Sequence, residues 1–136
     1  MNSPLDDVTT DEWQDARRAI ASLIGKSEKA QQKVAPGTWQ HTMLEENLTA
    51  LRIAWALMEQ RAGATGTFGA GNLPDALRAF ASMTSKTEKA QARFSPGTSQ
   101  HTLLRNRLKA LRTAEALTRA QLTSAMPNEA MQRTPT

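Results

Sequence analysis

Cysteine and tyrosine are absent from this chain of 136 residues, and its only aromatic residues are three tryptophans and three phenylalanines. Without cysteine, a disulfide framework, a thiolate zinc site and a cysteine nucleophile are all excluded. No stretch approaches the roughly 20 apolar residues that a membrane span needs, and the first residues lack the pattern of an export signal. We therefore expect a soluble, cytoplasmic protein with no membrane partner.

The residues that are abundant favour helix. Alanine, leucine, glutamine, lysine and arginine dominate, and their intrinsic propensities favour helix over strand. The formal net charge of +4 is unevenly distributed, because residues 1–61 hold seven basic and nine acidic groups while residues 72–122 hold nine basic and three acidic groups. A basic half suits either a nucleic acid or an acidic neighbouring surface.

An internal repeat dominates the sequence. Residues 15–57 align without a gap on residues 75–117, and 25 of these 43 positions are identical. A repeat of this length is one supersecondary unit that cannot bury its own apolar face. In each copy two amphipathic stretches flank a Pro-Gly turn, which makes the two helices antiparallel neighbours. The sequence therefore predicts an all-α fold, an antiparallel four-helix bundle built from two tandem helical hairpins with pseudo-two-fold symmetry.

Capping and turn signals set the expected boundaries. Residues 9–12 form a capping box, and Asn72 and Pro74 suit the start of the third helix. We expect helical hairpin repeats at 9–61 and 72–124, a glycine-rich linker at 62–71 and disordered segments at 1–8 and 125–136, all in one domain. A structural role in the two hairpin turns is predicted for Pro36, Gly37, Thr38 and His41, and for Pro96, Gly97, Thr98 and His101.

The two histidines, His41 and His101, are equivalent in the repeat, but two ligands are too few for a typical zinc site. The nearest carboxylate, Glu45, becomes Arg105 in the second copy. We favour a structural role, in which each imidazole packs over the turn and hydrogen-bonds a free helix end. The acidic pair Glu45–Glu46 lacks a further Glu-x-x-Asp motif that could complete a magnesium site. No metal ion, cofactor or catalytic residue is therefore expected.

Differences between the copies are more informative about function. Four basic residues share one side of the fourth helix: Arg105, Lys109, Arg112 and Arg119. Such a stripe can follow a nucleic-acid backbone, although no exposed aromatics are expected beside it for base stacking. The first copy has Glu45, Thr49, Arg52 and Glu59 at these positions. Complementary pairs, Glu45 with Arg105 and Glu59 with Arg119, are therefore expected within one chain or between two.

The first copy is also more apolar, and all three tryptophans lie in it. If some of its large side chains do not fit inside one bundle, they expose an apolar patch that marks a partner surface. The candidate interface consists of Trp39, Ile53, Trp55 and Met58, with Glu45 and Glu59.

These differences favour a non-catalytic interaction protein, acting as a homodimer or binding a protein partner on the first hairpin. The alternative is a nucleic-acid-binding module that uses the fourth helix. A small-ligand binder or enzyme would need a pocket lined by His41 and His101.

Two resemblances accompany these predictions. Each copy carries a Lys-x-Glu-Lys-Ala-Gln helix, a Gly-Thr-x-Gln-His-Thr turn and a Leu-x-Ala-Leu-Arg helix, and in these it resembles short bacterial proteins of unassigned function. That resemblance implies no activity. Residues 127–136 resemble the translated recombination sites that end some integron gene cassettes. This second resemblance implies a mobile bacterial accessory gene, whose tail is a by-product of where the stop codon falls.

Overall fold

Four helices make up most of the residues that the computed structural model describes, which are residues 9–61 and 73–133. They are α1 (Thr10–Gln32), α2 (Trp39–Arg61), α3 (Leu73–Gln91) and α4 (Ser99–Arg133). No strand occurs within the two described ranges, so the predicted all-α class and the two helical hairpins are confirmed. The expected linker at 62–71 and the expected disordered segment at 1–8 lie outside the described residues.

Helix α1 begins at the capping box that the sequence predicts. The Thr9 hydroxyl accepts a hydrogen bond from the Glu12 backbone N–H at 3.1 Å, and the Glu12 carboxylate accepts one from the Thr9 backbone N–H at 3.4 Å. Two backbone donors that have no partner inside the helix are satisfied in this way. At the other end of the chain, α4 continues to Arg133 instead of ending near residue 124. The expected tail is therefore helical as far as Arg133.

The two hairpin turns have nearly the same geometry. Gly37 and Gly97 have φ angles of 90° and 92°, a region that glycine enters without steric cost. The Thr38 hydroxyl donates to the Ala35 carbonyl at 2.7 Å and accepts from the His41 backbone N–H at 3.3 Å. Thr98 makes the equivalent bonds at 2.8 and 3.2 Å. The shared Pro-Gly-Thr block therefore ends one helix and caps the next.

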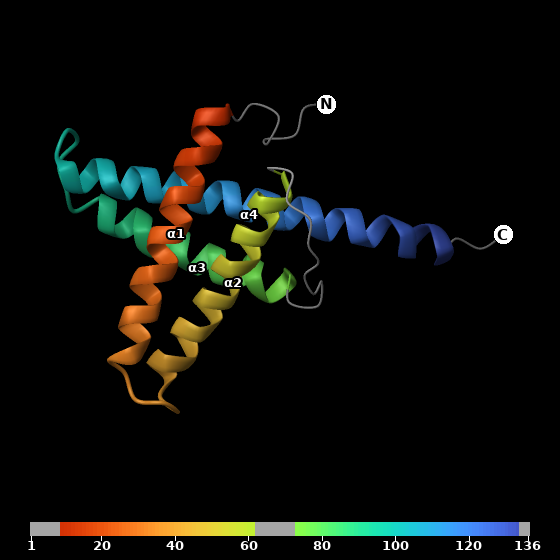
Figure 1. The fold of residues 1–136 in the computed structure, drawn as a ribbon, viewed down its shortest axis with the longest axis horizontal. Helices are drawn as coiled ribbons and strands as arrows, with labels where there is room; N and C mark the ends of the chain where they lie inside the picture. The colour runs from red at the N-terminus through yellow and green to blue at the C-terminus, as the bar shows by residue number, and fades with distance from the viewer. Residues whose placement is uncertain (1–8, 62–72, 134–136) are drawn as a thin grey trace.

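The two hairpins cross one another (Figure 1), and each of the four helices contacts the other hairpin there. Helices α2 and α4 contact each other, and each also contacts both remaining helices. Because α1 packs on α4 as α3 packs on α2, the arrangement has the predicted pseudo-two-fold symmetry, with α2 and α4 next to the axis. The four-helix bundle is thus made of crossed hairpins.

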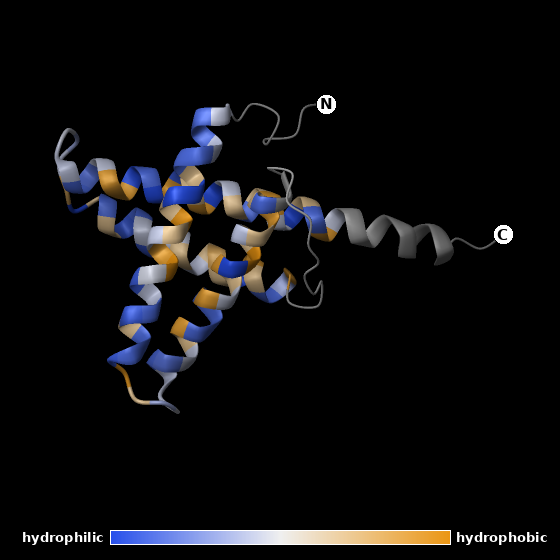
Figure 2. Cartoon of the chain, in the orientation of Figure 1, coloured by the Kyte–Doolittle hydropathy of each residue, from blue (hydrophilic) through white to orange (hydrophobic). Residues whose placement is uncertain are grey.

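Most of the core lies at this crossing, where hydrophobic residues gather (Figure 2). Ile20 of α1 and its counterpart Phe80 of α3 are completely buried. Burying a side chain of that size contributes about 1.5–3 kcal/mol. The largest group of buried small residues lies on the two axial helices, which carry Ala50, Ala54, Ala110 and Ala114 with at most 1% exposure. Small side chains let these helices approach closely.

Each hairpin also has an arm that extends beyond the crossing to its turn (Figure 1). We call residues 21–47 arm 1 and residues 81–107 arm 2. Neither arm contains a single buried residue, although several of its side chains are half-buried between its two helices. Since an isolated pair of helices buries little apolar surface, the crossing holds the fold together and the arms supply the surface.

Alanine substitutions at Gly25 and Gly37 test backbone strain without a steric clash, because a Cβ added at either position meets nothing within 4 Å. Gly25 lies inside α1, so Gly25→Ala should stabilise the fold by about 0.5–1 kcal/mol. Gly37 has positive φ, so Gly37→Ala should destabilise it by roughly 1–2 kcal/mol. Urea denaturation followed by circular dichroism measures both values. Effects of the same sign would contradict this assignment of the turn.

Candidate functional site

The structure places the six candidate interface residues in different environments. Ile53 and Met58 are 8% and 1% exposed and belong to the core, so they do not form a surface patch. Their inclusion in the interface was wrong, because both side chains pack into the core at the crossing. Trp39 alone among the large apolar candidates stays on the surface, with 71% exposure.

Trp55 and Glu59 are engaged within their own hairpin. Trp55 packs partly buried against the core, and the Arg17 guanidinium lies 5.2 Å from the centre of its ring. The same guanidinium forms an ion pair with Glu59. Arg17 was not found from the sequence, because its counterpart is Leu77 and the repeat therefore gives no signal of a role. These three side chains join α1 to α2 instead of facing a partner.

The ion pairs expected across the axis, Glu45 with Arg105 and Glu59 with Arg119, do not form within the chain. Glu59 binds Arg17, and Arg119 binds Glu115 at 2.9 Å. Glu45 accepts a hydrogen bond from Gln31 at 2.5 Å. Instead, each hairpin has one inter-helix ion pair that the repeat preserves. Arg52 binds Glu28 at 2.9 Å, and Arg112 binds Glu88 at 3.5 Å.

Two grooves lie between the hairpins at equivalent places. The α2–α3 groove has a volume of about 640 Å³ and is lined by the start of α2 and the first half of α3. The α1–α4 groove, about 530 Å³, is lined by the first half of α1 and the start of α4. Its walls correspond to those of the first groove by the 60-residue offset of the repeat.

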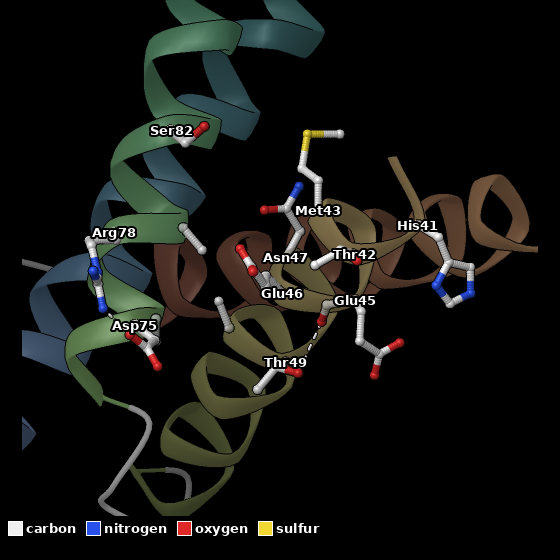
Figure 3. A pocket seen from close by; sticks show the side chains of 13 residues that line it. His41, Thr42, Met43, Glu45, Glu46, Asn47, Thr49, Asp75, Arg78 and Ser82 are labelled. Atoms are coloured by element: carbon white, nitrogen blue, oxygen red, sulfur yellow. Dashed lines mark hydrogen bonds and ion pairs between the residues drawn. The ribbon is translucent and has the colours of Figure 1, made fainter. Parts of the chain in front are cut away.

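The grooves differ in charge. The α2–α3 groove has three carboxylates, from Glu45, Glu46 and Asp75, and one guanidinium, from Arg78, which pairs with Asp75. Figure 3 shows Glu46 and Asn47 on the side of α2 that faces α3, while His41 and Glu45 point away from α3. The α1–α4 groove has more cations than carboxylates, with its basic groups being Arg18, Lys109 and Arg112. Divergence between the copies has therefore changed the walls of equivalent grooves.

A third hollow lies on arm 2 itself, between the end of α3 and the start of α4, with a volume of about 520 Å³. It brings together three of the four residues of the predicted basic stripe, Arg105, Lys109 and Arg112. The fourth, Arg119, is bound to Glu115 and does not line this α3–α4 hollow. The stripe is therefore split, with three of its residues in the α3–α4 hollow and the fourth outside it.

Phe94 also lines the α3–α4 hollow and is 39% exposed. It continues the helical spacing of Phe80, Met83, Thr87 and Ala90, but α3 ends at Gln91, so the helix does not reach it. Pro96 is the nearest signal of this ending in the sequence, since helices usually end at or before the residue that precedes a proline. An exposed aromatic ring therefore stands beside the basic residues, contrary to the expectation from the sequence.

The two histidines line different hollows, His41 the α2–α3 groove and His101 the α3–α4 hollow. The shared pocket that a histidine-based ligand site would need is therefore not formed. In the turns, each histidine contributes its backbone N–H to the threonine cap, and neither imidazole has a hydrogen bond to the described residues. Within residues 9–61 and 73–133, no group of three or more potential metal-ligating side chains comes together. None of the helices in the described segments is long and apolar enough to cross a membrane.

The ion pairs predict a difference in coupling that double-mutant cycles can measure. Arg17 and Glu59 are each about one-third exposed, at 32% and 33%, whereas Arg52 and Glu28 are about half exposed, at 53% and 48%. With Arg17→Met and Glu59→Gln, we expect a coupling of about 1 kcal/mol, and with Arg52→Met and Glu28→Gln about 0.3 kcal/mol. Urea denaturation of the single and double variants gives these values. A stronger coupling for the second pair would contradict the internal role of Glu59.

Comparison of the chain with protein-family models, with curated proteins and with solved structures finds no match. The geometry nevertheless defines two distinct surfaces. One is the tip of arm 1 with Trp39, next to the α2–α3 groove, and the other is the α3–α4 hollow with its basic residues and Phe94.

Proposed function

We propose that this protein is a non-catalytic interaction protein that self-associates through arm 1. The observation that carries this proposal is the position of Trp39, which is the first residue of α2 and stands 71% exposed at the tip of the arm. Tryptophan is highly buried on average, and it is enriched among the residues that contribute most to protein interfaces. The equivalent turn in the second hairpin has Ser99 at this position. The exposed tryptophan therefore indicates a contact that only the first hairpin makes.

The structure of arm 1 supports the same proposal. Without a buried residue between positions 21 and 47, its two helices cover each other only in part. Val34 and Leu44, for example, remain half-buried. A second arm packed against the first would complete a four-helix arrangement, and two-fold symmetry would let both copies use the same surface.

Charge favours arm 1 over arm 2 for this contact. Arm 1 contains three basic residues, at 26, 29 and 33, and three acidic residues, at 28, 45 and 46, so its formal net charge is zero. Arm 2 contains five basic residues and one acidic residue, which gives a formal net charge of +4. Two copies of arm 1 can therefore approach without net repulsion, whereas two copies of arm 2 repel each other.

The experiment that tests self-association replaces Trp39 with the residue at the equivalent position of the second copy. Trp39→Ser should keep the fold, because the turn of arm 2 has the same geometry with Ser99 in that place. Loss of an interface tryptophan should weaken dimer formation by roughly 30-fold or more, the equivalent of about 2 kcal/mol. Sedimentation velocity across a concentration series measures this change.

Gln40→Ala is the matched control, because Gln40 is the exposed neighbour of Trp39 and is identical in both copies as Gln40 and Gln100. It should leave the dimer unchanged. A wild-type protein that stays strictly monomeric at roughly 100 μM, where a micromolar dimer would be largely formed, contradicts self-association. The Trp39 surface would then be left for a different protein partner.

A further inference from the structure

Arm 2 carries the charge that distinguishes the second copy from the first. Its formal net charge is +4, against zero for arm 1, and Lys109 and Arg112 add two cations where α4 enters the crossing. The core does not require this charge, because no residue of arm 2 is buried. The charge of arm 2 is therefore a property of its surface and not of the core.

Two cations in the α3–α4 hollow have no acidic partner. Arg112 forms an ion pair with Glu88 at 3.5 Å. Arg105 and Lys109 form no ion pair with any residue that the structure describes. They lie four residues apart on α4, where like charges repel each other. Holding two such cations side by side is unfavourable until an anion binds between them.

The equivalent position on arm 1 has different residues and can be compared with the hollow on arm 2. There Glu45 replaces Arg105 and Thr49 replaces Lys109, while Gln31 donates a hydrogen bond to Glu45 at 2.5 Å. Arm 1 therefore satisfies its own polar groups at this position. The same fold at arm 2 leaves Arg105 and Lys109 without a partner among the described residues, so the two arms differ in their surfaces and not in their fold.

Phe94 adds a second kind of contact to the α3–α4 hollow. Phe94 is 39% exposed and lines the same hollow as the basic residues, and its counterpart in arm 1 is the smaller Val34. An aromatic ring beside a basic groove is the combination that single-stranded nucleic acids require, because the cations neutralise phosphates and the ring stacks on an unpaired base. An acidic peptide would use the cations without needing the ring.

We propose that the α3–α4 hollow binds single-stranded nucleic acid, with Arg105, Lys109 and Arg112 on successive phosphates and Phe94 against a base. This proposal goes beyond self-association, because it uses arm 2 and does not depend on the contact made by Trp39. The two arms point in different directions from the crossing (Figure 1), so both surfaces can be occupied in one molecule.

Fluorescence polarisation with labelled oligothymidine and oligouridine of about 20 nucleotides tests the proposal at several salt concentrations. Three phosphate contacts on a single strand predict a slope near −2 in a plot of log affinity against log salt. Affinity should therefore fall roughly 20-fold between about 50 and about 200 mM salt. A duplex of the same length should bind more weakly, since its bases are not available to Phe94.

Variants built from the first copy separate the two kinds of contact. Arg105→Glu with Lys109→Thr should reduce the slope to about −0.7, because one phosphate contact remains. Phe94→Val should weaken binding roughly 10-fold at every salt concentration and leave the slope unchanged. Lys33→Glu with Lys29→Thr is the matched control, because it makes the same change in net charge at two exposed positions that line neither the hollow nor the adjoining α1–α4 groove.

Salt-dependent binding that is reduced by both hollow variants and not by the control supports the proposal. No binding at about 50 mM salt overturns the proposal. An equal loss with the control pair also overturns it, because the charge would then act without a defined site. Equal competition by polyglutamate, with no effect of Phe94→Val, also overturns it and identifies the hollow as a surface for acidic peptides.

Discussion

The close packing of α2 against α4 is the constraint on which the rest of the structure depends. Ala50 and Ala54 are buried together with their counterparts Ala110 and Ala114. Small residues at these positions let the two axial helices approach closely, so the hairpins pack across each other at one place. The core is then concentrated at the crossing, and the turn end of each hairpin extends from it as an arm with no buried residue. A larger side chain in place of any of these alanines would separate the hairpins.

Local signals in the sequence were sufficient to predict the helices and the two hairpin turns. The capping box at Thr9, the glycines of positive φ and the threonine caps lie where the sequence predicts them. Each depends on interactions among residues within three or four positions of one another, so a single sequence can reveal it. The crossing could not be predicted in this way, because hydrophobic periodicity shows which face of a helix is apolar but not the angle at which that face meets another helix.

That limit explains which site residues were assigned wrongly. Ile53 and Met58 were candidates for a surface patch in case one bundle could not hold them, yet the crossing buries them. Phe94 fits the helical spacing of the apolar residues before it, yet it follows the end of α3. Comparison of the two copies also singled out Trp39 and Arg105, which the structure places on the surface. Whether a divergent residue alters the core or the surface depended on the tertiary contacts.

The arms explain why one duplicated fold can have two surfaces of opposite character. Residues at the crossing serve both hairpins at once, so the repeat retains alanine and leucine there in both copies. Residues on the arms touch little beyond their own hairpin, and a change there costs the fold little. Arm 1 could therefore keep balanced charge and display Trp39 while arm 2 became basic and displayed Phe94. Because the crossing holds the two arms apart, the surface of one arm can change without altering the surface of the other.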